Sequence, residues 1–202
     1  MTTSTTPPVL LIAASPSLRS RSGALLAGAA ERLHHHGLST RTLRLRELPA
    51  QSLLHADVDD PAIRDALAAV AEARVVVLAT PIYKAAYSGL LKVFLDLLPQ
   101  DGLAGKLVLP VATGGSQSHM LALDYALRPV LSSLNPRHVL PSIYATEAQV
   151  TWSEELGLQL DAPIAARVDE GVAQLSASLL AQRQMAPETL REVPFSQVRC
   201  SV

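Results

Sequence analysis

The fold is decided first by the stretch Val9-Leu-Leu-Ile-Ala-Ala-Ser-Pro-Ser-Leu-Arg-Ser-Arg-Ser22, in which an apolar run stops in a hydroxyl-rich turn. A short apolar run bounded by turn residues is typical of a strand buried on both faces of a parallel sheet. The turn then lies at the carboxyl end of the strand, where open α/β sheets bind ligands. Ser15, Ser20 and Ser22 offer hydroxyl groups, and the Arg21 guanidinium can contact two phosphate oxygens together. The stretch predicts a phosphate-binding turn, with a plain helix N-cap as the alternative.

Strand and helix patterns alternate along the chain, which predicts a parallel sheet with helices on both faces. The expected strands are 9–14, 39–45, 74–79, 106–112 and 137–145, and the expected helices are 20–36, 60–73, 88–98, 120–134 and 161–184. With right-handed crossovers, this order fits an α/β fold of the flavodoxin-like type, with five parallel strands in the order 2-1-3-4-5. We expect one domain over residues 9–184, a disordered N-terminus over 1–8 and a poorly ordered tail over 185–202.

The composition argues against several classes of protein. A formal net charge of −1 and an aromatic content of 3% disfavour nucleic-acid binding. No apolar run reaches the roughly 18 residues that a transmembrane helix needs, and the first residues lack the basic segment of a signal peptide. We therefore expect a cytoplasmic protein without membrane contact. Because Cys200 is the single cysteine, we expect neither an internal disulfide nor a cysteine-based metal site, and we predict no metal.

Two further loops have unusual composition and should lie beside the first loop at one edge of the sheet. In the loop after the third strand, Pro81, Ile82 and Tyr83 are suited to lie against a planar heterocycle, although ordinary packing is the alternative. The loop after the fourth strand contains Gly114 and Gly115, which lack a Cβ and allow backbone amides to approach a ligand such as a flavin ring. A plain turn is the alternative there. The coincidence of three such loops predicts a ligand site.

Three segments carry a resemblance to a known family. They are Ala14-Ser-Pro-Ser-Leu-Arg-Ser-Arg-Ser22, Ala79-Thr-Pro-Ile-Tyr-Lys-Ala-Ala-Tyr-Ser-Gly-Leu-Leu-Lys92 and Leu109-Pro-Val-Ala-Thr-Gly-Gly-Ser-Gln-Ser-His-Met-Leu-Ala-Leu-Asp-Tyr-Ala-Leu-Arg-Pro-Val-Leu131. In this order the chain resembles the NADPH-dependent FMN reductase family, and within it the reductase components of two-component alkanesulfonate monooxygenase systems. The resemblance extends over roughly residues 9 to 180. One departure is Ala14, where the family usually has glycine.

The resemblance implies that the protein transfers hydride from NADPH or NADH to FMN. It also implies that reduced FMN is supplied to a partner monooxygenase in sulfonate sulfur assimilation, and that the protein is a homo-oligomer, either a dimer or a tetramer. It places the FMN phosphate on the first loop, one side of the isoalloxazine on the second and the pyrimidine edge on the third. The cofactor-binding residues so implied are Ser15, Ser20, Arg21, Ser22, Pro81, Ile82, Tyr83, Lys84, Thr113, Gly114, Gly115 and Ser116.

Tyr125 lies in an otherwise regular helical pattern. The resemblance implies a one-residue π-bulge there, at a tetramer interface and linked to the exchange of flavin as a substrate; a locally satisfied tyrosine on a buried helix face is the alternative. Hydride transfer between two stacked rings requires no side-chain acid, base or nucleophile, so we predict none. For the 2′-phosphate that distinguishes NADPH from NADH, Arg19, Lys84 and Arg128 are unranked candidates.

Two other functions are alternatives. The first is a flavoprotein that retains FMN and reduces a quinone, an azo dye or a metal oxyanion. The second is an electron carrier without enzymatic activity, like flavodoxin. Carriers of that kind tend to be strongly acidic, and the net charge of −1 argues against this alternative.

Overall fold

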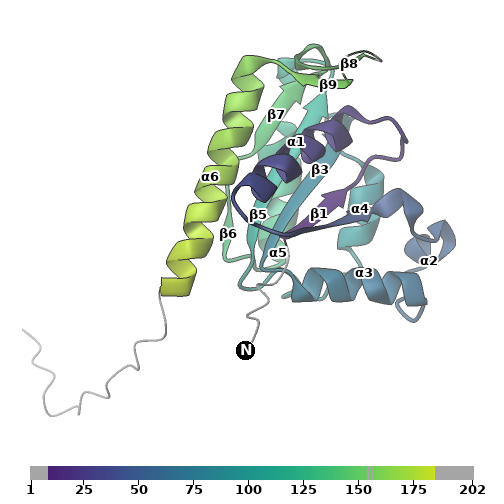
Figure 1. Cartoon of the computed structure of the whole chain (residues 1–202). Coiled ribbons are helices and arrows are strands. Elements are labelled where there is room, and N and C mark those ends of the chain that lie inside the picture. The colour runs from purple at the N-terminus through teal and green to yellow at the C-terminus, as the bar shows by residue number, and fades with distance from the viewer. Residues whose placement is uncertain (1–8, 154, 156, 185–202) are drawn as a thin grey trace, which may run out of the picture.

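The structure is a computed structural model that describes residues 9–153, 155 and 157–184 (Figure 1). The disorder predicted for residues 1–8 and 185–202 therefore concerns segments that lie outside the described residues. The domain limits stay a prediction. Within the described part of the chain, none of the helices combines the length and the apolar composition needed to cross a membrane.

A parallel sheet forms the centre of the structure, as the alternating pattern predicts. Its strands are β1 (Val9–Ala13), β2 (Thr40–Arg44), β3 (Val75–Tyr83), β5 (Leu107–Gly114), β6 (His138–Val139) and β7 (Ile143–Thr146). They pair in the order β2-β1-β3-β5-β6, and β7 also pairs with β5. This order confirms the flavodoxin-like α/β fold, because it is the predicted 2-1-3-4-5 arrangement of parallel strands.

The predicted number of five strands is wrong, because the sheet has seven. The expected last strand is divided into β6, whose pairing with β5 ends at Val139↔Val108, and β7, whose pairing with β5 begins at Ile143↔Val111. Three residues lie between Val139 and Ile143, whereas two lie between their partners Val108 and Val111 on β5, so the outer strand has one extra residue. The interruption contains Pro141, which lacks an amide donor. The seventh strand, β4 (Ala86–Tyr87), exists because β3 continues past its predicted end and turns back on itself.

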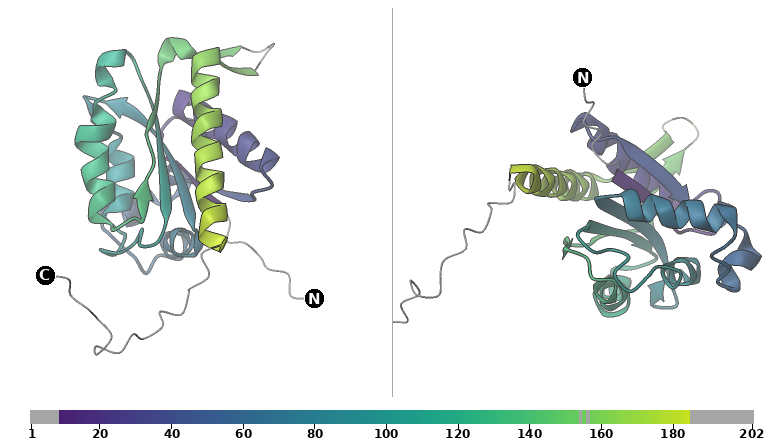
Figure 2. Two further views of the ribbon diagram at one scale, coloured as in Figure 1. Left: turned by 90° about the vertical axis from the view of Figure 1, so that its left-hand side faces the viewer. Right: turned by 90° about the horizontal axis from the view of Figure 1, so that it is seen from below.

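Helices cover both faces of the sheet (Figure 2). On one face lie α1 (Arg21–His35) and α6 (Ala162–Gln184). The opposite face is covered by α2 (Ala50–Leu54), α3 (Pro61–Glu72), α4 (Gly89–Leu95) and α5 (Arg128–Ser133). The short α2 was not predicted from the sequence.

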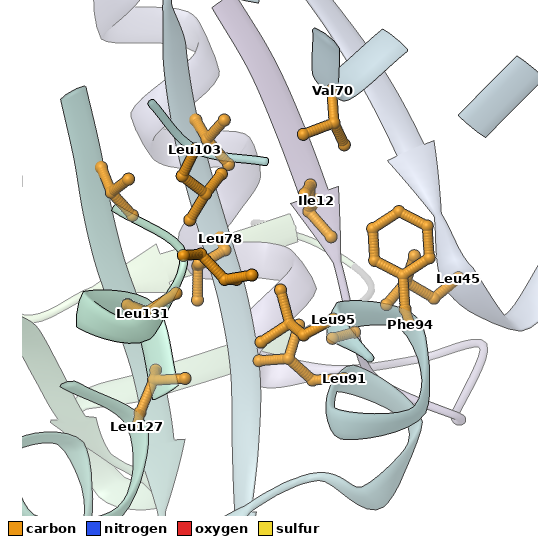
Figure 3. Close-up of a cluster of buried hydrophobic side chains, with 14 of the residues drawn as sticks. Ile12, Leu45, Val70, Leu78, Leu91, Phe94, Leu95, Leu103, Leu127 and Leu131 are labelled. Atoms are coloured by element: carbon orange, nitrogen blue, oxygen red, sulfur yellow. The ribbon is translucent and has the colours of Figure 1, made fainter. Parts of the chain in front are cut away.

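The continuous apolar runs of the strands follow from this two-sided cover. Leu10 and Ile12 of β1 pack toward α3 and α4, whereas Val9 and Leu11 pack toward α1 and α6. Figure 3 shows Ile12 in one cluster with Leu91 from α4. A strand that is buried on both faces has no polar alternation, which is why its pattern could be recognised from the sequence.

The helix predicted over 120–134 is irregular in the structure. A 3₁₀ turn at Gln117–His119 is followed by a π-helical segment, Leu123–Leu127, and only then by α5. Beyond the central sheet, β8 (Val150–Ser153) and β9 (Gly157–Leu160) form an antiparallel hairpin that was not predicted. Four-residue strands of mixed composition give too short a periodic signal to be distinguished from a loop.

Candidate functional site

The three loops singled out from the sequence meet at the carboxyl edge of the sheet. Strands β1, β3 and β5 are adjacent and parallel, so the segments that follow them lie side by side. With the turn after β7 they line a cavity of about 150 Å³, here called the edge cavity. Its lining residues are Ser15, Ser17, Arg19, Ser20, Arg21, Pro81, Ile82, Tyr83, Thr113, Gly114 and Glu147.

Four of the predicted cofactor-binding residues do not line this cavity. Ser22 is only 1% exposed and its hydroxyl is hydrogen-bonded to the hydroxyl of Ser20 at 2.8 Å, so it positions Ser20 from behind. Lys84 is exposed at the tip of the β3–β4 hairpin. Gly115 and Ser116 are exposed just beyond the end of β5.

The first loop provides the polar end of the cavity. Ser20 is the N-cap of α1, and its side-chain oxygen accepts a hydrogen bond from the Gly23 amide at 3.2 Å. Ser15 is buried and its hydroxyl oxygen accepts a bond from the Ser17 amide, also at 3.2 Å. A helix N-terminus with serine hydroxyls and a guanidinium beside it is a set of donors suited to a phosphate. Ala14, the departure from the family pattern, has no positive φ, so its methyl group is accommodated without backbone strain.

Glu147 was missed by the sequence analysis because it comes from a distant segment, the turn after β7. Its carboxylate oxygen Oε2 lies 3.2 Å from Nη1 of Arg21, and both side chains are about half exposed. The cation expected to bind phosphate is therefore already shared with an anion in the same cavity. No local motif marks a glutamate for this role, so no signal in the sequence reveals it.

Ser88 links the first two loops from beneath the cavity. The buried hydroxyl donates to the carbonyl oxygen of Ala14 at 2.7 Å, and the Ser88 amide donates to Oγ1 of Thr80 at 2.9 Å. The same hydroxyl oxygen accepts the amide of Leu91 and so caps α4. Through its side chain and its amide, Ser88 thus holds the end of β1, Thr80 of β3 and the start of α4 in a fixed relation. From the sequence it could be identified only as a helix N-cap.

The second loop is a tight hairpin with a strained turn. Tyr83 pairs with Ala86, which leaves Lys84 and Ala85 as the two turn residues, with φ values of +49° and +62°. Such turns favour Asn-Gly, because residues with a Cβ are disfavoured in the left-handed region. Strain of this kind is concentrated at functional sites, and here it places the half-exposed Tyr83 at the wall of the edge cavity.

The third loop approaches so closely that only glycine fits at its first position. A Cβ on Gly114 would lie 2.4 Å from the hydroxyl oxygen of Tyr144. Tyr144, on β7, donates its hydroxyl to the Ser116 carbonyl at 2.6 Å and thereby fixes the turn. Burial raises the pKa of the Tyr144 phenol, so the group remains a donor through neutral pH. The sequence analysis did not identify Tyr144 as part of the site.

These observations fit the group that the resemblance implies. The serine hydroxyls and Arg21 are suited to the FMN phosphate, and Pro81 and Ile82 offer an apolar wall. Gly114 lines the same cavity, and the lack of a Cβ there lets the backbone pack directly against the Tyr144 hydroxyl.

Comparison with known proteins decides the family. A family model described as NADPH-dependent FMN reductase matches residues 7–151, well over half of the chain. The chain belongs to this family. As an NADPH-dependent FMN reductase family member it is an oxidoreductase that uses FMN together with NADPH or NADH.

Individual family relatives agree with this assignment. An "FMN reductase (NADPH)" of Pseudomonas putida KT2440 is 44% identical over 186 residues, which cover 91% of this chain and 94% of the relative. The solved apo structure of an NADH:FMN oxidoreductase, EMOB, superposes with a TM-score of 0.78 at 37% identity, covering 86% and 90% of the two chains. A flavodoxin of Streptococcus pneumonia TIGR4 has a TM-score of 0.56 at 16% identity over 85% and 98% of the chains, which shows the fold alone.

Tyr125 does lie in a π-helical segment, as the resemblance implied, although it does not line the edge cavity. Its side chain is 79% exposed, which contradicts the alternative of a tyrosine on a buried helix face. The segment lies against β4 of the strained hairpin. A function of Tyr125 in flavin exchange or at a subunit interface stays a prediction.

Proposed function

We propose that the edge cavity binds FMN, and that FMN is reduced there by NAD(P)H and then released. The supporting observation is the composition of one cavity built from three separate loops. Its first loop offers phosphate donors, its second an apolar wall, and its third the backbone of Thr113 and Gly114. This order of functional groups matches the phosphate, the ring face and the pyrimidine edge of FMN.

In this proposal each residue binds or orients. Ser15, Ser20 and Arg21 hold the phosphate, Tyr83 and the adjoining apolar residues flank the ring, and the amides near Gly114 stabilise negative charge at the pyrimidine edge. When bound, the flavin supplies the chemistry by accepting hydride at N5 from the nicotinamide. The protein therefore contributes placement, and none of the described residues is assigned a proton-transfer role.

We further propose that reduced FMN leaves the protein in the cytoplasm and serves a partner monooxygenase, in sulfonate sulfur assimilation, as the resemblance to the alkanesulfonate group implies. The half-exposed pair of Arg21 and Glu147 supports release, because a phosphate must compete with the carboxylate for the same guanidinium. We also propose that the protein acts as a homo-oligomer.

The test is steady-state NADPH oxidation by the full chain, measured against FMN concentration. Arg21→Gln should raise the apparent KM for FMN about tenfold, the lower end expected for a half-exposed hydrogen bond to a charged group, and should change kcat little. Arg64→Gln is the matched control, because Arg64 is an exposed arginine on α3 and does not line the edge cavity. Riboflavin, which lacks the phosphate, should be used equally well by Arg21→Gln and the unmodified protein.

Three results would overturn the proposal. An equal loss with riboflavin would show that Arg21 does not bind the phosphate. Yellow flavin retained through gel filtration would favour a tightly bound prosthetic group and hence the reduction of a quinone, an azo dye or a metal oxyanion. NADPH oxidation that does not depend on added FMN would point in the same direction.

A further inference from the structure

A second cavity shares a wall with the edge cavity. Its volume is about 420 Å³, and it lies between the first loop and residues 150–152 of β8. Arg19, Ser20 and Arg21 line both cavities. A ligand that occupies the edge cavity can therefore extend along this wall without leaving the surface of the protein. We call this space the Trp152 cavity.

An aromatic ring and a guanidinium face each other in the Trp152 cavity. The Arg19 guanidinium lies 5.2 Å from the centre of the Trp152 ring, and the side chain of Trp152 is 56% exposed. An accessible indole beside an arginine is suited to a nucleobase, which stacks on the ring, and to a phosphate, which pairs with the cation. The sequence named Arg19 as one of three candidates for the 2′-phosphate, but it did not predict Trp152 beside it, because Trp152 belongs to the hairpin that was not foreseen.

Arg19 is the cation of this wall that is free to bind an anion. Arg21 is paired with Glu147, whereas no ion pair involving Arg19 is present within residues 9–153, 155 and 157–184. The other two candidates for the 2′-phosphate are placed differently. Arg128 bonds Asp124 at 3.1 Å and the Val139 carbonyl at 3.3 Å, and Lys84 lines neither cavity.

We propose that the Trp152 cavity binds the adenosine end of the nicotinamide dinucleotide, with Trp152 against the adenine and Arg19 at the 2′-phosphate. This inference rests on the proposed function, because the nicotinamide end must then reach the flavin ring in the edge cavity. The dinucleotide carries its nicotinamide and its adenosine at opposite ends. One end can therefore lie in the edge cavity while the other lies in the adjoining Trp152 cavity. Arg19 thereby becomes the residue that selects NADPH over NADH.

The first experiment uses the intrinsic fluorescence of the protein. Trp152 is the single tryptophan of the chain, so its emission reports on this cavity directly. The full chain is titrated without flavin, using 2′,5′-ADP and, in parallel, 5′-AMP. We expect a saturable change in emission with both probes, and binding of 2′,5′-ADP about tenfold tighter. Arg19→Gln should bring the two affinities to within about twofold. An unchanged emission, or an equal affinity of both probes for the unmodified protein, would overturn the proposal.

The second experiment compares kcat/KM for NADPH and NADH at saturating FMN. Arg19→Gln should lower the NADPH-to-NADH ratio about tenfold, while Lys84→Gln and Arg128→Gln, which replace the other two candidates, should leave it unchanged. Trp152→Ala should raise KM for both coenzymes by the same factor, and Trp152→Phe should restore it because an aromatic face is retained. A ratio that follows Lys84 or Arg128 instead would refute the assignment of Arg19.

The two proposals fail in different ways. If FMN does not bind, calorimetry with FMN shows no heat of binding and the proposed function is wrong, whereas the fluorescence titration with 2′,5′-ADP still shows saturable binding. If FMN binds and is reduced but 2′,5′-ADP leaves the emission of Trp152 unchanged, the proposed function stands and only the adenosine site is refuted.

Discussion

Gly114→Ala should destabilise the protein, because the new methyl group would collide with Tyr144. The added Cβ would lie 2.4 Å from the Tyr144 hydroxyl oxygen and 3.2 Å from Cζ. Tyr144 is 1% exposed and cannot turn into solvent. The phenol must therefore shift within the core, and its 2.6 Å hydrogen bond to the Ser116 carbonyl is lost.

The size of the effect follows from these two consequences. Forcing an extra methyl group into a packed core costs about 1–3 kcal/mol. The lost hydrogen bond adds about 1 kcal/mol, which brings the expected destabilisation by Gly114→Ala to about 2–4 kcal/mol. The neighbouring residue provides the matched control. A Cβ on Gly115 meets nothing within 4 Å and its φ is not positive, so Gly115→Ala should change the stability by less than about 0.5 kcal/mol.

The assay is equilibrium urea unfolding of both variants and of a double-mutant cycle with Tyr144→Phe. Tyr144→Phe alone should cost about 1 kcal/mol, and it removes the oxygen atom with which the new methyl group collides. The double variant should therefore be at least about 1 kcal/mol more stable than the sum of the single effects predicts. Additive effects, or equal stability of Gly114→Ala and Gly115→Ala, would refute the reasoning.

Three further predictions concern the turn between β3 and β4, the pair of Arg21 and Glu147, and Asp60 at the N-cap of α3. Ala85→Gly should stabilise the protein by about 1 kcal/mol, because glycine adopts the positive φ of +62° without penalty; a lower thermal midpoint would contradict this. Glu147→Gln should tighten FMN about two- to fivefold by freeing Arg21, and calorimetry with riboflavin should show no change; weaker FMN binding would refute the competition. The hydrogen bond from Ser52 lowers the pKa of Asp60 in the folded protein. The stabilisation that this bond gives is therefore fully present above the ordinary carboxyl pKa and disappears as the pH falls through the lowered pKa of Asp60. Ser52→Ala should therefore reduce stability at neutral pH but not in acid, where unfolding curves should coincide; a constant difference would exclude this linkage.

The sequence predicted the parts of the fold that depend on local patterns. The apolar runs of β1 and β3 have no alternation because helices cover both faces, and Asp60 followed by Pro61 marks the start of α3. The divided last strand was missed because Pro141 lies inside an apolar run whose pairing partner cannot be known from the sequence.

In the candidate site, too, only the features that depend on local sequence patterns were predictable. The loop residues follow buried strands and have distinctive compositions, so their convergence could be foreseen. The residues that support them could not, because each acts across a long separation in sequence. Ser88 bonds a carbonyl 74 residues away, and Tyr144 bonds a carbonyl 28 residues away. Only the packed structure brings such partners together, since the sequence marks Ser88 only as a helix N-cap and Tyr144 lies in none of the quoted segments.

The support of the site and its lining differ in rigidity, and this difference bears on how long a flavin stays bound. The backbone of all three loops is held from behind by hydroxyl groups of buried residues: Ser88 donates to the Ala14 carbonyl, Thr80 accepts the Ser88 amide, and Tyr144 donates to the Ser116 carbonyl. By contrast, the side chains of Arg21 and Glu147, which line the edge cavity, are about half exposed and paired with each other. A rigid backbone lowers the entropic cost of binding a flavin, whereas charges that are exposed and already paired add little to the affinity for it. Rapid and repeated exchange of one flavin for another requires both properties together, and a permanently bound cofactor would require buried charges in place of the pair.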